Sequence, residues 1–159
     1  MEKFRNQKGV RINIVLTFSV PGEPRGKGRP RFSRYTGKVY TDSETDSYEK
    51  KIIIYFRKSC GGLKFDDGAF VSVDVVAYLP IPKSATKANR AAMEAGVILP
   101  SRKPDTDNIA KAVLDALNGI AYKDDARVQR ICCSKLYGTD PRIEVTLQEV
   151  KNEGKTVIL

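Results

Sequence analysis

The chain has 159 residues, of which 41% are hydrophobic and 30% charged, and its formal net charge is +9. This length and composition are typical of one globular domain, so we expect a single domain over residues 1–159 with a core over about 10–150. The charge excess indicates a polyanionic partner, with a basic surface tuned for solubility as the alternative. Histidine is absent, which excludes histidine general bases, His-ligated zinc and Ser-His-Asp triads.

The cysteines and the apolar segments indicate the compartment. Cys60, Cys132 and Cys133 are an odd number without a CxxC spacing, which argues against a disulfide framework or a zinc site and for a reducing cytosol. We interpret them as small buried hydrophobic residues. No apolar run approaches the roughly 18 residues of a membrane span, and the N-terminal apolar stretch lacks a signal-peptide cleavage site. We therefore expect a cytoplasmic protein without membrane contacts.

Strict alternation of apolar and polar residues predicts a first strand over residues 10–20. Its inward face is expected to carry Val10, Ile12, Ile14, Leu16, Phe18 and Val20. A helix is predicted over residues 41–62, capped by Asp42 or Ser43 and ended by Gly61. Its apolar stripe comprises Tyr48, Ile52, Tyr55 and Phe56. Alternation returns over residues 69–79, which predicts a second strand that ends at Pro80.

The second half of the chain contains two further helices and two strands. A helix capped by Ser84 and ended by Gly96 is predicted first. A second helix runs from about residue 107 to 118 and closes at Gly119, and strands follow near residues 127–137 and 142–149. The resulting order β-α-β-α-α-β-β predicts an α+β fold in which a mixed β-sheet packs against helices.

Between the first strand and the first helix lies a segment rich in Pro, Gly and Arg, which cannot form a regular helix. From residue 25 to 38 this basic segment contains no acidic residue, and Phe32 and Tyr35 interleave with its charges. Its basic residues are Arg25, Lys27, Arg29, Arg31, Arg34 and Lys38. Such a composition suits contacts with nucleic-acid phosphates, and a solvated flexible loop is the alternative.

Four acidic residues, Asp105, Asp107, Asp124 and Asp125, lie at the two ends of the predicted helix over 107–118. On a helical wheel the core-facing stripe comprises Ile109, Val113, Ala116, Leu117 and Ile120. Asp107 and Lys111, four residues apart, are neighbours on the accessible side. Asp124 and Asp125 are expected to return to the start of this helix if the helix packs antiparallel to the strand that follows.

Converging carboxylates repel one another unless a cation joins them, and oxygen-only ligands favour Mg²⁺ or Mn²⁺. Such an ion activates water and stabilises a leaving oxygen, while Lys111 adds positive charge for a phosphate. This chemistry is phosphodiester hydrolysis. The alternative is structural: an N-cap at Asp105 or Asp107 worth about 1 kcal/mol, an Asp107–Lys111 pair worth about 0.2–0.5 kcal/mol, and a plain turn at residues 124–125. The spacing alone leaves both interpretations open.

Residues 104–128 resemble the signature of the RusA family of Holliday junction resolvases, which are bacterial and phage-borne endonucleases. The pattern D-x-D-N-x-x-K, then D-A-L-N-G and a D-D pair, is met by Asp105, Asp107, Asn108, Lys111, Asp115, Ala116, Leu117, Asn118, Gly119, Asp124 and Asp125. The stretch PGEPRGKGRPRF is similar to the opening motif of the family. The resemblance extends from about Ile14 to Leu147. The chain is longer than the compact members, mainly through residues 41–68 and the last few residues.

The resemblance implies a homodimer that resolves four-way DNA junctions by Mg²⁺-dependent paired nicks, with Mn²⁺ as a substitute. By this resemblance Asp105, Asp107 and Asp125 are catalytic metal ligands, Asp124 is a possible further ligand, and Lys111 is the essential catalytic lysine. We expect contacts with the DNA backbone from Arg25, Lys27, Arg29, Arg31 and Lys103. The alternatives are a nuclease for forks, flaps or other branched DNA, and a nucleic-acid-binding protein without catalysis.

Overall fold

The computed structural model describes residues 14–28, 31–32, 34–35, 37, 39–40 and 43–150. Its elements are β1 (Val15–Pro21), β2 (Arg31–Phe32), β3 (Val39–Tyr40), α1 (Ser43–Cys60), β4 (Val71–Pro80), α2 (Lys87–Glu94), α3 (Thr106–Leu117), a 3-10 helix η1 (Asp125–Arg127), β5 (Val128–Gly138) and β6 (Arg142–Glu149). The predicted α+β class and the predicted order are confirmed. The additions are η1 and the short β2/β3 hairpin, whose first strand falls within the basic segment.

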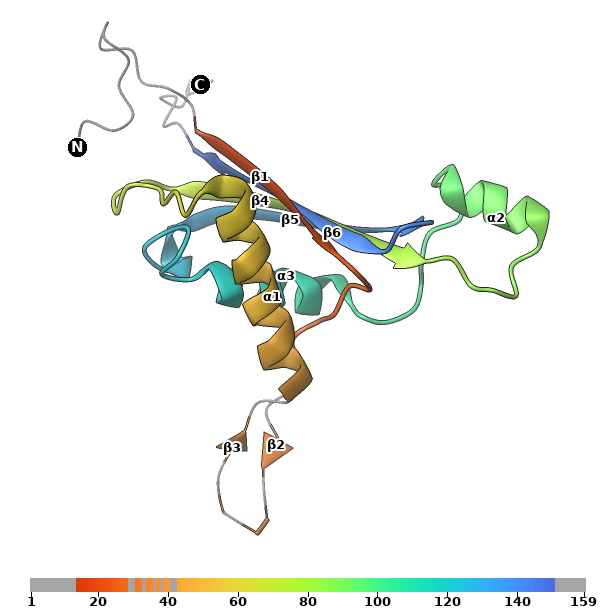
Figure 1. Ribbon diagram of the computed structural model, residues 1–159, viewed down its shortest axis with the longest axis horizontal. Helices are drawn as coiled ribbons and strands as arrows, with labels where there is room; N and C mark the ends of the chain where they lie inside the picture. The colour runs from red at the N-terminus through yellow and green to blue at the C-terminus, as the bar shows by residue number, and fades with distance from the viewer. Residues whose placement is uncertain are drawn as a thin grey trace, which may run out of the picture.

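The four larger strands form one mixed sheet in the order β1-β6-β4-β5. β6 is antiparallel to both β1 and β4, whereas β4 and β5 are parallel. Helices α1 and α3 lie side by side on one face of this sheet, α1 against β1 and α3 against β5 (Figure 1). Helix α2 lies beyond the end of the sheet, and the β2/β3 hairpin projects from the start of α1 (Figure 1). No helix among the described residues is long and apolar enough to cross a membrane.

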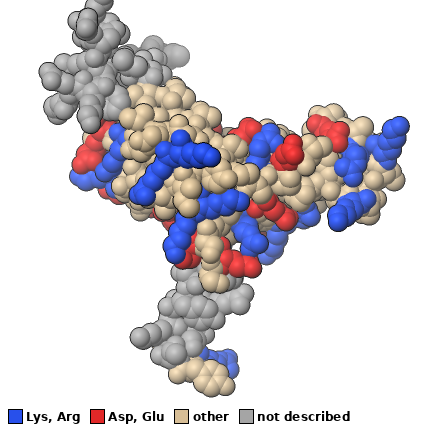
Figure 2. Space-filling view, viewed as in Figure 1, with Lys and Arg blue, Asp and Glu red and all other residues tan. Residues whose placement is uncertain are grey.

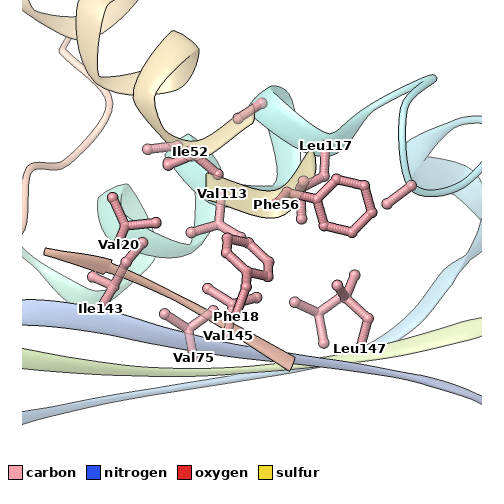
Figure 3. Close-up of a cluster of buried hydrophobic side chains, with 14 of the residues drawn as sticks. Phe18, Val20, Ile52, Phe56, Val75, Val113, Leu117, Ile143, Val145 and Leu147 are labelled. Atoms are coloured by element: carbon pink, nitrogen blue, oxygen red, sulfur yellow. The ribbon is translucent and has the colours of Figure 1, made fainter. Parts of the chain in front are cut away.

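The core lies between the sheet and the two helices, as Figure 3 shows. Alternate residues of β1, β4 and β6 point into it, which confirms the period-2 pattern for these strands. The buried strand residues are Leu16, Phe18, Val20, Val71, Val73, Val75, Ala77, Leu79, Ile143, Val145 and Leu147. Val10 and Ile12, the first residues of the predicted inward face, lie outside the described residues.

Helix α1 buries Tyr48, Ile52 and Phe56, which recur every four residues and therefore share one face. The ring of Phe56 meets that of Phe18 edge to face, with centroids 5.5 Å apart. Tyr55 is only partly buried beside this stripe. The helix ends before Gly61, whose φ of 61° is the left-handed conformation that glycine adopts readily.

The prediction that Ser84 caps α2 is wrong. Thr86 is the cap, because its Oγ1 accepts a hydrogen bond from the Asn89 backbone N–H at 3.2 Å. Ser84 lies instead in a turn that is closed by the bond from the Ala85 N–H to the Pro82 carbonyl. The predicted end of the helix is confirmed by Gly96, which has a φ of 72°.

The cysteines differ from one another in burial. Cys60 is buried as expected, whereas Cys133 is partly buried and Cys132 is exposed. The expectation of a small buried side chain is therefore wrong for Cys132. The physical reason is that Cys132 lies on an edge strand and pairs in register with Asp74, on the face of the sheet opposite to α1 and α3.

We predict that Phe56→Ala lowers the free energy of unfolding by about 3–5 kcal/mol, because it removes a fully buried ring and leaves a cavity. The matched control is Ile54→Ala on the same helix, where the side chain is 61% exposed. This control is expected to change stability by less than about 0.5 kcal/mol. Urea denaturation of both variants tests the prediction, and equal losses would contradict it.

Candidate functional site

Helix α3 presents one face to the core and the other to solvent. Ile109, Val113, Ala116 and Leu117 are buried, which confirms the predicted stripe, and Ile120 packs against the core just beyond the helix. Asp107 and Lys111 are both exposed, as the helical wheel predicts. The sequence pattern therefore placed these two polar side chains on the correct side of the helix.

Asp105 occupies the N-cap position of α3, with an extended backbone at φ −75° and ψ 151°. Its side chain nevertheless makes no capping hydrogen bond. Its backbone carbonyl accepts a hydrogen bond from the Ile109 N–H at 3.1 Å. An N-cap aspartate normally stabilises the helix through its carboxylate. Because that bond is not made, the structural interpretation does not account for the Asp105 carboxylate, which is exposed to solvent.

Asp107 and Lys111 are not paired with each other. Within the part of the chain that the structure describes, the contact recorded for the Asp107 carboxylate is a long one, 3.4 Å, from the Asn108 side-chain amide. No ion pair of Lys111 is recorded among those residues either. The structural alternative of an i,i+4 pair is therefore not realised, and the Lys111 side chain is exposed to solvent.

The two acids after the helix differ in role. The Asp124 carboxylate caps η1 by accepting a hydrogen bond from the Ala126 N–H at 3.0 Å. Its interpretation as a turn residue therefore fits the structure. Asp125 is the first residue of η1 and is exposed. Burial is the main cause of the raised pKa of the Tyr122 phenol, and the negative charge of Asp125 raises this pKa further.

Strand β5 runs antiparallel to α3. Near the end of β5, Lys135 donates hydrogen bonds to the carbonyls of Arg102 and Pro104, just before the helix, at 2.8 and 3.1 Å. Tyr122, which precedes β5, donates to the Leu114 carbonyl in the last part of the helix at 3.0 Å. Asp125 therefore lies toward the C-terminal end of α3, whose 12 residues span about 18 Å.

This geometry corrects the expectation that antiparallel packing returns Asp124 and Asp125 to the start of the helix. The turn after Gly119 is short, so the strand begins where the helix ends. Among the described residues, no three acidic, cysteine or histidine side chains form a group that could hold a metal ion. One chain brings Asp105 and Asp107 to the start of α3 and keeps Asp125 at the other end.

A cleft of about 750 Å³ opens beside the start of α3. It lies between the loop over residues 23–28, the first turn of α1 and residues 103–108. Four of the predicted site residues line it: Arg25, Lys27, Lys103 and Asp105. The structure therefore brings the first part of the basic segment against the acidic motif, although the two are about 80 residues apart in the sequence.

Gly26 permits this contact. A Cβ atom at this position would lie 2.8 Å from the Cβ of Asn108 and 3.1 Å from that of Pro104. The next residue, Lys27, donates its backbone N–H to the Asn108 carbonyl at 2.8 Å, and the Gly28 N–H donates to the Thr45 hydroxyl at 3.2 Å. The loop is thereby held between α3 and α1, and only glycine fits at the closest point.

Lys27 has structural partners on both helices. Its ammonium pairs with Glu49 of α1 and, at 2.9 Å, with Asp115 of α3. Burial alone lowers the pKa of this ammonium, but hydrogen bonds and charges from Glu49 and Asp115 outweigh burial, so the pKa of Lys27 lies above its ordinary value. Because two carboxylates already hold Lys27, a contact with DNA from this residue stays a prediction.

The other predicted DNA contacts differ in what the structure describes. Arg25 pairs with Glu44, and its side chain is 52% exposed. Lys103 is exposed at the rim of the cleft. Arg29 lies outside the described residues, and Arg31 is described only as part of the backbone of β2. Figure 2 shows acidic and basic side chains intermixed below the sheet on the face in view.

Sequence reasoning missed three residues that position the site: Glu49, Asp115 and Lys135. For Lys135 a signal was available. It follows Cys133 by two residues and pairs in register with the buried Ala77, so it lies on the inward side of its strand. A charge there needs a partner, which the carbonyls of residues 102 and 104 provide. No local signal identified Glu49 and Asp115 as the partners of Lys27.

Comparison with known proteins gives two findings. Residues 21–148 match the model of a family described as endodeoxyribonuclease RusA. The chain is also 40% identical, over 138 residues, to the uncharacterized protein YqaN of Bacillus subtilis (strain 168). This similarity covers 85% of the chain and 96% of the relative. The family match includes the cleft and α3.

We predict that Lys27→Met lowers the free energy of unfolding by about 2–4 kcal/mol, because it leaves two carboxylates facing each other without a cation. Arg25→Gln, which breaks an exposed pair, is expected to cost less than about 1 kcal/mol. Adding Glu49→Gln to Lys27→Met should recover part of the loss. Chemical denaturation at neutral pH measures all three, and similar values for the two single variants would contradict the prediction.

The same pair predicts a pH dependence. The folded pKa of Lys27 is raised above the ordinary value of 10.5, so its stabilising contribution is present below that pH and is lost as pH rises through the raised value. The difference in unfolding free energy between the wild type and Lys27→Met is therefore expected to stay constant near neutrality and to shrink above about pH 10.5.

Proposed function

Because this chain belongs to the RusA endodeoxyribonuclease family, we propose that it is a Mg²⁺-dependent endonuclease that resolves four-way DNA junctions by paired, symmetric nicks. The observation that carries the proposal is the cleft, which joins an exposed carboxylate, Asp105, to the basic residues Arg25 and Lys103. A phosphodiester needs cations to bind it and an acidic centre to support its hydrolysis. The residues lining this cleft supply both.

In this proposal Lys103 and Arg25 bind backbone phosphates at the entrance of the cleft, with Lys27, Arg29 and Arg31 as further contacts. Lys111 lies one turn beyond Asp107 on the exposed face of α3, where its ammonium neutralises charge on the scissile phosphate. These contacts position the DNA backbone without reading its bases. The selection of branched DNA then depends on the shape of the substrate.

Asp105 and Asp107 suit Mg²⁺, which proteins commonly bind through one or two carboxylates together with water and substrate phosphates. That the Asp105 carboxylate is not used as a helix cap supports this role. When bound, Mg²⁺ or Mn²⁺ would lower the pKa of a water molecule and stabilise the leaving oxygen. Asp125 is the third proposed catalytic acid. Asp124 is at most a support, because it caps η1.

Two further parts of the proposal follow from the substrate. Symmetric cuts in two opposed strands need two identical sites, which a two-fold homodimer provides. Action on cellular DNA places the protein in the cytoplasm of a bacterium or of a phage-infected cell. A related activity on forks or flaps is the alternative within the same family, and comparing the three substrates distinguishes it.

We predict that Asp107→Asn reduces nicking of a synthetic four-way junction by at least about 100-fold while junction binding is retained or tightened, since the change removes a negative charge that faces phosphates. Asp67→Asn is the matched control, because Asp67 is an exposed aspartate whose recorded partner is Lys64. Lys111→Ala is also expected to abolish nicking, because it removes the positive charge proposed for the scissile phosphate. Gel-based nicking and binding assays with Mg²⁺ measure these effects.

Three results would count against the proposal. The first is full activity in excess EDTA. The second is equal cleavage of junction and plain duplex. The third is a parallel loss of binding and thermal stability in Asp107→Asn, which would favour a structural role for this residue. Ca²⁺ is expected to permit junction binding with little nicking, because Ca²⁺ is larger than Mg²⁺ and its coordination geometry is less strict.

A separate prediction concerns phosphate binding. Each phosphate contact on duplex DNA contributes about −0.9 to the slope of log affinity against log salt concentration. Lys103→Ala is therefore expected to make the slope shallower by about one unit and to weaken junction and duplex binding by similar factors. Lys58→Ala on α1 is the control, because Lys58 is exposed and does not line the cleft. An unchanged slope for Lys103→Ala would remove this residue from the DNA surface.

A further inference from the structure

Residues 81–103, which we call the arm, leave the end of β4 and return to the start of α3. The arm carries α2 beyond the end of the sheet (Figure 1). None of the eight residues of α2 is buried, so this helix adds nothing to the core. A helix of this length is marginal in water unless its side chains pack against something. The arm therefore has the properties of a surface that a partner covers.

The base of the arm is fixed and adjoins the cleft. The Arg102 guanidinium donates a hydrogen bond to the Pro80 carbonyl at 2.7 Å, which joins the two ends of the arm. The same guanidinium lies 4.0 Å from the Glu23 carboxylate, and both Glu23 and Lys103 line the cleft. A molecule that extends out of the cleft on this side therefore meets the arm.

The arm concentrates positive charge. It contains five basic residues and a single acidic one, Glu94, so its net charge is +4, against +9 for the whole chain. Lys83 and Lys87 are exposed and Arg90 is half-buried. Among the described residues no ion pair is recorded for any of these three. Figure 2 shows several basic side chains over α2. This charge is complementary to a polyanion.

Two exposed aliphatic side chains lie in the chain between the cations of α2 and those at the base of the arm. Val97 is 76% exposed and Leu99 is 60% exposed. The turn that holds them is well defined, because the N–H groups of Val97 and Ile98 both donate to the Ala92 carbonyl, at 2.9 and 3.2 Å. Contacts with phosphates alone do not need aliphatic groups. Aliphatic groups that cations flank on both sides suit the apolar faces of bases between phosphate backbones.

We propose that the arm recognises the branch point of branched DNA. Val97 and Leu99 contact the face of a base pair at the branch, while Lys87 and Arg90 bind phosphates of the duplex that leaves it. A continuous duplex keeps its base pairs stacked, whereas a branch point interrupts the stack and gives aliphatic side chains access to a base-pair face. The inference rests on the proposed function. It adds a selection for branched DNA that phosphate contacts in the cleft do not supply.

A protein partner is a poorer match for this surface. The centres of protein interfaces are rich in aromatic residues and depleted in lysine and alanine. The arm contains no aromatic residue, and the exposed apolar residues of α2 itself are Ala88 and Ala91. The arm is also continuous with the cleft, which favours the molecule that the cleft binds.

The aliphatic pair is tested with Val97→Ser/Leu99→Ser in the full-length chain. Binding of a synthetic four-way junction in Ca²⁺ is expected to weaken by at least about tenfold, because the burial of two aliphatic side chains is lost. Plain duplex binding and the salt dependence of junction binding are expected to stay unchanged. The matched control is Ile54→Ser/Leu63→Ser, at side chains that are 61% and 44% exposed. Unchanged junction affinity, or an equal loss with duplex, would overturn the proposal.

A fluorescent base reports the contact with the branch point. 2-Aminopurine brightens when it is unstacked, so a junction that carries this base beside the branch is expected to brighten when the wild type binds. Val97→Ser/Leu99→Ser, at a concentration that saturates the junction, is expected to leave the base dark. The same base in the middle of a duplex is expected to stay dark with both proteins. An equal rise with wild type and variant would contradict the assigned contact.

The cations of α2 are tested with Lys87→Ala/Arg90→Ala. Two lost phosphate contacts are expected to make the slope of log junction affinity against log salt concentration shallower by about two units. The slope for a short plain duplex is expected to stay unchanged. Arg57→Ala/Lys58→Ala, at two exposed cations in the last turn of α1, is the matched control. An unchanged junction slope would remove α2 from the DNA surface.

The outcomes separate this inference from the proposed function. A wild type that nicks junctions in Mg²⁺, with both arm variants as selective for junctions as the wild type, would reject the inference alone and leave the arm to a protein partner. A wild type that prefers junctions through the arm but nicks no DNA would reject the proposed function and leave the inference standing. Because the changed side chains are not buried, unchanged melting temperatures are expected. If one arm variant does not fold, the other decides.

Discussion

The ammonium of Lys27 lies between a carboxylate of α1, Glu49, and a carboxylate of α3, Asp115. This arrangement joins three parts of the chain, because Lys27 itself belongs to the loop that leaves β1. Its backbone also bonds to Asn108, and Gly26 beside it touches the start of α3. The cleft exists because these contacts hold the loop against the helix. The position of Asp105 relative to Arg25 and Lys103 depends on the same contacts.

The sheet provides the second constraint. The buried stripe of α3 packs against the sheet. The Lys135 ammonium of β5 donates hydrogen bonds to the carbonyls of Arg102 and Pro104, just before the helix. Because β5 begins near the end of α3 and its Lys135 reaches the residues before the helix, the helix and the edge strand run in opposite directions. Acids at both ends of α3 are therefore distant from each other within one chain.

The polar residues around α3 divide into those that hold the structure and those that it leaves available. Lys27, Glu49, Asp115, Asp124 and Lys135 all have partners within the fold. Few or no side-chain contacts within the described structure are made by Asp105, Asp107 and Lys111. These residues lie at the start and on the exposed face of α3, whose other face is buried. Exposed charges without a structural role next to a cleft that Arg25, Lys27 and Lys103 line are the pattern expected of a site that acts on an anion.

Much of the fold was predictable because the relevant forces are local. Alternation placed the inward residues of β1, β4 and β6, and the four-residue spacing in α1 and α3 placed their buried faces. Capping was less predictable: serine is the better N-cap in isolation, but Ser84 lies in the turn closed by the Pro82 carbonyl, and Thr86 caps the helix. The burial of Cys132 depends on whether its strand has a neighbour, which no local pattern encodes.

The sequence by itself determined which residue types are available for chemistry. A chain without histidine and with Asp105, Asp107 and Lys111 on the solvent side of one helix has carboxylates and lysine for catalysis. The tertiary structure decided where those groups lie relative to one another. It brought Arg25 and Lys27 against Asp105 across a long sequence separation, and it kept Asp125 apart. The reason is physical: periodicity reports which side of an element is buried, whereas the direction of β5 and the packing of the Gly26 loop depend on contacts between segments distant in the chain.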